Sequence, residues 1–294
     1  MDISKFCKTY KSDIICISLI LLIFCVCSYL LWGYFGSLLY DCGREAYLPQ
    51  LMLEGKILFK DIFGMYNPLS YQINALLYMI FGINTNVLYF AGTVNAFLTL
   101  ICLYFISRQF MNEKYSMGIV FFIMTTIIFN SHDCTNNVFP YAFAMAYATT
   151  AMLYSAFLGL LYLTKQKSVY IILSFLLLGI SLACKPEYVL CVITLISLMI
   201  YYKEKPKVWI FSILLFLLPT ILSYVILFLQ GFTTYDFIKY IDFINNFFAT
   251  KEQQNYNLFL LGNDSYLDMF FYFGSFSIFV VVIPAFLSKF IKQN

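Results

Sequence analysis

Long apolar runs constrain this chain more than any other feature of its sequence. A transmembrane helix needs about 20 mostly apolar residues. Such runs, with two shorter ones, occur along the whole chain: Ile14–Trp32, Val87–Ser107, Tyr115–Phe129, Val138–Leu163, Val169–Cys184, Tyr188–Tyr202, Val208–Leu229 and Tyr266–Leu287. We therefore expect an all-α, polytopic integral membrane protein with about eight transmembrane helices, and we treat residues 1–294 as one domain.

The composition supports lipid as the surrounding solvent. Hydrophobic residues make up 62% of the chain and charged residues 11%, whereas about a quarter of the residues in a soluble domain are charged. The formal net charge is only +3, and no basic block interleaved with aromatic residues is present. The expected partner is thus the lipid bilayer and not nucleic acid.

The distribution of Lys and Arg predicts the orientation. Most of the 18 basic residues fall in the N-terminal segment, in alternate loops and in the C-terminal tail. Because basic residues concentrate in cytoplasmic loops, we expect both termini to be cytoplasmic in a multi-pass protein of the inner (plasma) membrane.

A short hairpin turns at Lys185-Pro186-Glu187, between the two shorter apolar runs. At about 1.5 Å per residue these runs rise roughly 24 Å, less than the hydrocarbon core of about 30 Å. Lys185 and Glu187 are then recessed below the outer interface, where charges are expensive and usually functional. The alternative is a Lys185–Glu187 ion pair that only stabilises the hairpin.

Two exterior loops carry further structure. The first spans residues 33–86, and we expect two helices on the membrane surface within it, Glu45–Leu53 and Pro68–Phe81, the second ending at Gly82. The last spans residues 231–265, and in it an amphipathic helix is expected over Tyr235–Phe248.

The first exterior loop also concentrates the chemistry, and its motifs resemble a known family. In order, they are Asp41 after the first span, Gly43-Arg44-Glu45, Leu48-Pro49, Glu54-Gly55-Lys56, Lys60-Asp61, Tyr66-Asn67-Pro68-Leu69 and Phe81-Gly82. This order resembles bacterial members of the C-type (GT-C) glycosyltransferase superfamily, family-39-like, whose relatives include protein O-mannosyltransferases and the aminoarabinose transferase of lipid A. The chain departs from many members in having Asp41-Cys42 where they have an acidic pair, and in its smaller number of spans.

The resemblance implies a polyprenyl-phosphate-linked sugar donor and an acceptor in the cell envelope, a glycan, lipid or protein. Inverting transfer needs a base for the acceptor proton and cations for the leaving phosphate. Asp41 is the candidate base, the alternative being an N-cap for a helix over Arg44–Leu53. Arg44 and Lys185 are the candidate phosphate ligands; for Arg44, an ion pair with Asp41 or Glu45 is the alternative.

Other residues complete the predicted substrate site. Lys60, Asp61, Tyr66 and Asn67 are expected to position sugar hydroxyls, although Lys60 is equally interpretable as a solvated interfacial lysine. The remaining candidates are the acids that flank the basic residues and a recessed pair after the third span: Glu45, Glu187, His132 and Asp133. His132-Asp133 is alternatively a capped helix end.

No cofactor is expected, because no set of side chains has convincing metal-ligand spacing. Two rival functions stay open: a transporter or flippase for lipid-linked glycans, and a non-catalytic membrane paralogue. A flippase requires charges along a path through the bundle, whereas an enzyme of this kind gathers them at its outer rim.

Overall fold

The computed structural model describes residues 3–36, 38, 41–130 and 136–250. Over these residues the chain is all-helical, with no β-strand. The expected all-α class is thereby confirmed. The expected span Tyr266–Leu287 and the end of the last exterior loop lie outside the described residues.

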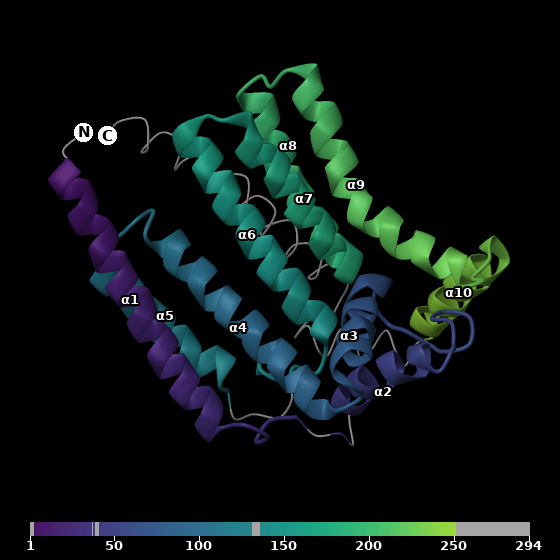
Figure 1. The fold of residues 1–294 in the computed structure, drawn as a ribbon. Helices are drawn as coiled ribbons and strands as arrows, with labels where there is room; N and C mark the ends of the chain where they lie inside the picture. The colour runs from purple at the N-terminus through teal and green to yellow at the C-terminus, as the bar shows by residue number, and fades with distance from the viewer. Residues whose placement is uncertain (1–2, 37, 39–40, 131–135, 251–294) are drawn as a thin grey trace.

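The main helices alternate in direction and form an up-and-down bundle (Figure 1). Within it α6 packs against α7, α7 against α9, and α4 against α6. The bundle is made of α1 (Ile3–Leu30), α4 (Thr85–Ser107), α5 (Glu113–Ile123) with a π-helical turn (Met124–Ile128), α6 (Phe143–Lys165), α7 (Ser168–Cys184), a 3-10 helix (Pro186–Cys191) leading into α8 (Val192–Tyr201), and α9 (Pro206–Leu229).

Four of the described helices are long and apolar enough to cross a membrane: α1, α4, α6 and α9. The outer flank of α9 exposes large apolar side chains, including Phe211, Leu214, Leu218 and Leu222. Exposed apolar surface of this extent suits contact with lipid better than contact with water. The segments α5, α7 and α8 are shorter, so the structure gives a membrane-type helical bundle without establishing eight spans.

Small residues allow the helices to approach closely. A Cβ atom added at Gly179 of α7 would lie 2.2 Å from the Phe216 carbonyl oxygen of α9, and one added at Gly92 of α4 would lie 1.9 Å from that of Val138. Hydroxyl pairs add polar links, with 2.9 Å between the Oγ atoms of Ser155 and Ser174 on α6 and α7. Close backbone contact and buried hydroxyl bonds are typical of helix packing in membranes.

Three expected helix starts need correction, the first being that of α1, which begins at Ile3 and not at Ile14. The helix expected over Glu45–Leu53 begins earlier, as α2 (Asp41–Leu53), and that expected over Val138–Leu163 begins later, as α6. Pro140 explains the later start, because a proline disfavours helical backbone at the residue before it. The Asn136 Oδ1 atom instead accepts hydrogen bonds from the backbone N–H groups of Val138 and Phe139 in a turn.

The other surface helix has the expected bounds, α3 (Pro68–Phe81) followed by Gly82 at φ 87°. It lies across one end of the bundle, where side-chain hydrogen bonds join it to α6, α7 and α9. These bonds run from Tyr147 to Asn74, from Asn67 to the Leu182 carbonyl and from Gln72 to the Ser223 carbonyl. Thus α3 covers one end of the bundle and holds the loop before α3 in place.

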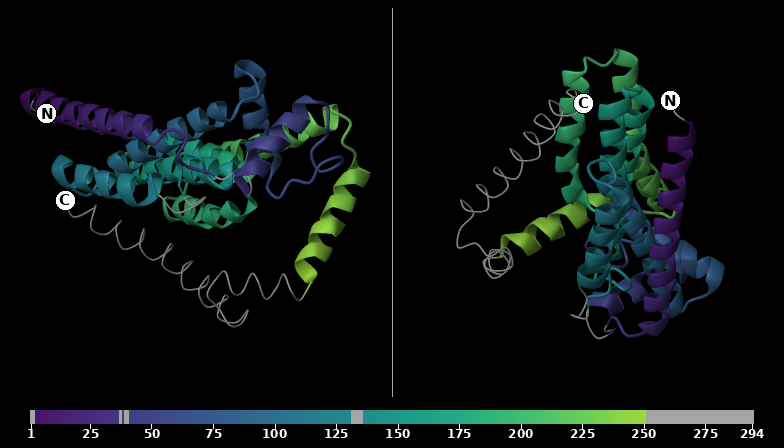
Figure 2. Two further views of the ribbon diagram at one scale, coloured as in Figure 1. Left: turned by 90° about the horizontal axis from the view of Figure 1, so that it is seen from below. Right: turned by 90° about the vertical axis from the view of Figure 1, so that its left-hand side faces the viewer.

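The expected amphipathic helix of the last loop is present as α10 (Thr234–Ala249), opened by a Thr233–Asp236 capping box. It leaves the bundle at the same end as α2 and α3 (Figures 1 and 2). The Lys-rich connections, at 108–114, 165–167 and 202–207, all lie at the opposite end, with the N-terminus (Figure 1). The two kinds of connection are therefore sorted to opposite ends of the described bundle.

Candidate functional site

The first turn of α2 carries three charged candidates in five residues. Asp41 is its first residue, where a negative charge is favourable near the positive end of the helix dipole. Gly43 is needed for a close approach, since a Cβ there would lie 2.1 Å from the Leu38 carbonyl oxygen. This contact seats the start of α2 against the turn that precedes it.

Glu45 is the buried acid of this turn, with a side chain that is 0% exposed. Its Oε2 atom accepts a hydrogen bond of 3.1 Å from the backbone N–H of Phe143, at the start of α6. Burial raises the pKa of Glu45 to about 7, despite the opposing effect of the neighbouring Arg44 charge. The desolvated carboxylate of this turn is thus Glu45 and not the candidate base Asp41.

Arg44 lies between the two acids. Its Nη1 atom is 3.2 Å from Asp41 Oδ1, and its Nε atom is 3.7 Å from Glu45 Oε1. Asp41 is far more open than Glu45, with 56% of its side chain exposed. The guanidinium carbon of Arg44 also lies 5.9 Å from the centre of the Tyr66 ring, within cation–π range.

Lys185 approaches the same Tyr66 ring from the C-terminal end of α7. It caps the C-terminus of α7, and its Nζ atom lies 5.6 Å from the Tyr66 ring centre. That atom also lies 3.7 Å from Glu187 Oε1, in a pair whose lysine is 18% and whose glutamate is 65% exposed. The expected hairpin pair is therefore present, with its acid open and its cation largely covered.

Tyr66 is held in place by the residues that follow it. The Nδ2 atom of Asn67 donates to the Leu182 carbonyl oxygen at 2.7 Å and joins this loop to the last turn of α7. Burial raises the pKa of Tyr66 to about 12, so its phenol stays neutral. The amide of Asn67 thus has a positioning role, and its contact with sugar hydroxyls stays a prediction.

We call this group the Tyr66 cluster: Asp41, Arg44, Glu45, Tyr66, Lys185 and Glu187.

Lys60 and Asp61 do not join the Tyr66 cluster. Lys60 Nζ donates to the Gly231 carbonyl oxygen at 2.8 Å and lies 3.8 Å from Asp236 Oδ2, at the corner between α9 and α10. Asp61 Oδ2 accepts from the Ile57 backbone N–H within its own loop. Both residues hold the loop between α2 and α3, and neither lines the Tyr66 cluster.

Two predicted site residues, His132 and Asp133, lie outside the described residues. In the part of the chain that the structure describes, no group of three or more His, Cys, Asp and Glu side chains is arranged to hold a metal ion.

Sequence reasoning missed Tyr141 as a neighbour of the cluster. Burial raises its pKa, and the charges of Asp41 and Glu187 raise it further, which places its phenol in the field of both exposed acids. Only its position directly after Pro140 hints at a special role, because no periodic pattern marks it. The Tyr141 hydroxyl donates to Met145 Sδ at 3.5 Å, and its phenol adds a second neutral ring beside that of Tyr66.

The arrangement can hold an anionic group. Two cations from distant segments converge on one aromatic ring, and an open carboxylate lies beside each of them, Asp41 beside Arg44 and Glu187 beside Lys185. Charge-assisted hydrogen bonds from Arg and Lys are the strong ligands of phosphate and carboxylate groups. No family model, characterised protein or solved structure matches this chain.

Proposed function

We propose that the chain is a polyprenyl-phosphate-sugar-dependent inverting glycosyltransferase that acts on an acceptor in the cell envelope. The observation that carries the proposal is the convergence of Arg44 and Lys185 on Tyr66, at 5.9 and 5.6 Å from its ring centre. A monoanionic lipid phosphate needs cations at a membrane interface. Arg44 and Lys185 come from separate elements and could bind such a phosphate together. In this assignment the cluster end faces the exterior and the chain crosses the membrane about eight times.

Three residues of the cluster, Asp41, Arg44 and Lys185, act in this reaction. The acceptor oxygen attacks the anomeric carbon, and the Asp41 carboxylate takes the acceptor proton. The bond between the anomeric carbon and the phosphate oxygen breaks, and polyprenyl phosphate leaves with the electron pair. Arg44 and Lys185 stabilise the charge that develops on that leaving phosphate.

The exposure of the two acids in α2 decides which one acts as the base. A general base must come within hydrogen-bond reach of the proton it takes. Asp41 is 56% exposed and can meet an acceptor, whereas Glu45 is fully covered and already holds the Phe143 backbone N–H. Glu45 is accordingly a positioning residue that holds Arg44.

The distribution of charges favours an enzyme over a flippase. The helices α4 and α8 contain no charged residue, and α6 and α9 have theirs only in a terminal turn. A flippase for lipid phosphates needs cations along its path, and the described charges gather at the two ends of the bundle instead. This supports chemistry at one end over transport through the centre.

A turnover assay tests the proposal. The purified protein is placed in lipid nanodiscs with radiolabelled polyprenyl-phosphate sugars and an envelope extract, and release of polyprenyl phosphate is measured. The proposal expects release that depends on wild-type Asp41. Donor that moves between leaflets without being consumed would indicate a flippase, and donor that is neither moved nor consumed would indicate a non-catalytic paralogue.

A further inference from the structure

A cavity lies on the face of α2 that points away from the Tyr66 cluster. It has a volume of about 340 Å³, near the lower end of the range of ligand pockets, which suits a small ligand. Gly43, Ala46, Tyr47 and Gln50 line it at the spacing of one helix face, whereas Glu45 points into the bundle. The rest of its wall comes from the turn before α2, from α3 and from the segment before α4: Leu38, Tyr78, Ile83, Asn84 and Thr85.

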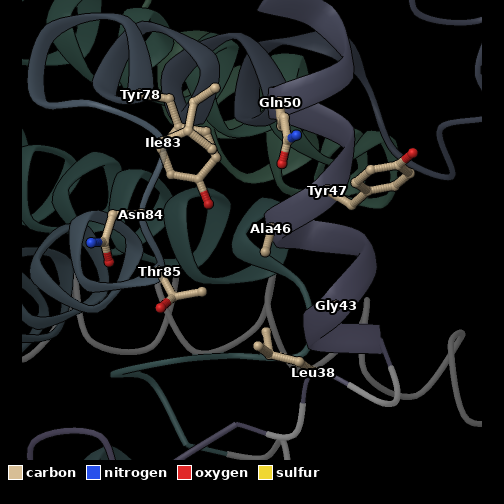
Figure 3. Close-up of a pocket in the computed structure, with 9 residues that line it drawn as sticks. All are labelled: Leu38, Gly43, Ala46, Tyr47, Gln50, Tyr78, Ile83, Asn84 and Thr85. Carbon is tan, nitrogen blue, oxygen red and sulfur yellow. The ribbon is translucent and has the colours of Figure 1, made fainter.

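The strongest sign of a ligand is the hydroxyl of Tyr78. The residue is only 2% exposed, yet its hydroxyl makes no hydrogen bond within the described residues. Burial raises the pKa of Tyr78 to about 12, so the group is a neutral donor. Figure 3 shows this hydroxyl pointing into the space between α2 and the 83–85 segment. The hydroxyl opens into the cavity, so a hydroxyl group of a ligand can replace water as its hydrogen-bond partner.

Gln50 supplies an acceptor to the same space. Its Nε2 atom donates to Glu54 Oε1 at 2.9 Å, which leaves the side-chain oxygen available. In Figure 3 this amide and the Tyr78 hydroxyl lie on opposite sides of the cavity, with Ala46 below them. The cavity therefore offers both a donor and an acceptor above a small apolar surface.

The wall of the cavity has no charged side chain. Its nine residues comprise amides, hydroxyls, phenols, one glycine and three aliphatic residues. A phosphate, carboxylate or ammonium group would enter without a counter-charge, which is unfavourable in a partly desolvated site. The ligand should instead be uncharged and carry hydroxyl groups that both donate and accept.

We propose that this cavity binds a neutral sugar ring. The ring hydroxyls would pair with the Tyr78 hydroxyl and the Gln50 side-chain oxygen, and its C–H face would pack on Ala46 and Ile83. The inference does not depend on the proposed glycosyl transfer, because it rests on a different face of α2. The sugar has two possible sources, a soluble glycan or the head of a glycolipid.

Saturation-transfer NMR on the protein in nanodiscs tests the proposal. The probes are the methyl glycosides of glucose, galactose, mannose and N-acetylglucosamine, with glucose 6-phosphate as the charged comparison. At least one neutral glycoside should give a signal that Tyr78→Phe lowers about fivefold or more, as expected for loss of a buried hydrogen bond. Glucose 6-phosphate should give a weaker signal than that glycoside.

Two further variants separate binding from folding. Ala46→Met fills the cavity without removing a polar group and should also abolish the signal. Tyr34→Phe removes a phenol that is 81% exposed and outside the cavity wall, and it should leave the signal unchanged. Melting temperatures measured on each variant identify any that fails to fold.

A glycolipid arm distinguishes the two sources. Nanodiscs that contain monoglucosyl diacylglycerol should suppress the glycoside signal if the sugar is lipid-borne and leave it intact if the sugar belongs to a soluble glycan. No signal from any neutral glycoside, equal signals in wild type, Tyr78→Phe and Ala46→Met, or stronger binding of glucose 6-phosphate would overturn the proposal.

Discussion

The Nζ atom of Lys185 lies 5.6 Å from the centre of the Tyr66 ring. This contact joins the turn after α7 to the loop before α3, and Asn67 reinforces the junction by donating to the Leu182 carbonyl oxygen. Because Arg44 approaches the same ring, one tyrosine sets the spacing between the two cations. The proposed phosphate site is thus preorganised by neutral residues and does not depend on its ligand for assembly.

The first prediction concerns Asp41. Asp41→Asn removes the proposed base with little change in shape, so turnover should fall by about 100-fold or more. Binding of the donor should persist, because Arg44 and Lys185 remain. Glu54→Gln, at an exposed acid later in the same loop, is the matched control and should keep wild-type turnover. Wild-type turnover in Asp41→Asn would remove Asp41 from the mechanism.

The pKa of Glu45 predicts a pH dependence of stability. Burial raises this pKa from 4.5 to about 7, so the folded state keeps its proton over a range in which the unfolded state has lost it. Stability should therefore fall as pH rises from 4.5 to 7, by an amount on the order of 3 kcal/mol, and stay level above that.

Glu45→Gln isolates this contribution. The glutamine carbonyl can still accept from the Phe143 backbone N–H but does not titrate. Melting temperatures of wild type and Glu45→Gln, recorded between pH 4.5 and 8, should converge at low pH and diverge as pH rises. Parallel curves over the whole range would show that Glu45 does not titrate with a raised pKa.

A third prediction tests the packing that carries Lys185. Gly179→Ala places a Cβ 2.2 Å from the Phe216 carbonyl oxygen, where α7 meets α9. Because backbone must move, the variant should lose about 1–3 kcal/mol of stability. Gly118→Ala in α5 is the control, since nothing lies within 4 Å of its Cβ, and it should be neutral or slightly stabilised by its helix propensity. Equal melting temperatures in the two variants would contradict the α7–α9 contact.

The topology predicts which sites a membrane-impermeant thiol reagent reaches. In intact cells, single cysteines at Tyr34 and Glu54 should label, and those at Lys114, Lys165 and Lys205 should label only after the membrane is opened. All five positions are exposed, and the two groups lie at opposite ends of the bundle. Labelling of Lys205 from outside would contradict the cytoplasmic assignment of the connection between α8 and α9.

Local signals predicted the elements, and long-range contacts decided the rest. Pro68 and Gly82 mark the ends of α3 in the sequence because each acts on its own backbone. The start of α2 depends instead on the approach of Gly43 to Leu38, a contact that no periodicity encodes. The starts of α2 and α6 therefore depend on a close local contact and on Pro140, neither of which hydrophobic periodicity records.

The candidate site divides in the same way. The sequence predicted Arg44 and Lys185 as functional cations, because charges near the membrane are costly. In the structure both lie near the Tyr66 ring. Lys60 has the same chemistry, but its partners, Gly231 and Asp236, belong to the α9–α10 corner. Nothing near Lys60 in the sequence indicates that pairing, since the contact forms only when the last loop folds back.

The central claim is that Lys185 holds the phosphate of the donor. Lys185→Met keeps most of the side-chain volume and removes the charge. Glu187, its present partner, is 65% exposed, so water solvates this carboxylate once the lysine charge is removed. The variant should therefore fold with a melting temperature close to that of wild type. Lys56→Met, at an exposed lysine in the loop between α2 and α3, serves as the control.

The most direct measurement is the change in melting temperature on addition of polyprenyl phosphate, since a ligand stabilises only the state that binds it. The melting temperatures of wild type and Lys56→Met should rise equally, and that of Lys185→Met should rise clearly less. An equal rise in all three proteins, together with a lower melting temperature of Lys185→Met before addition, would reduce Lys185 to the structural partner of Glu187 and contradict the claim.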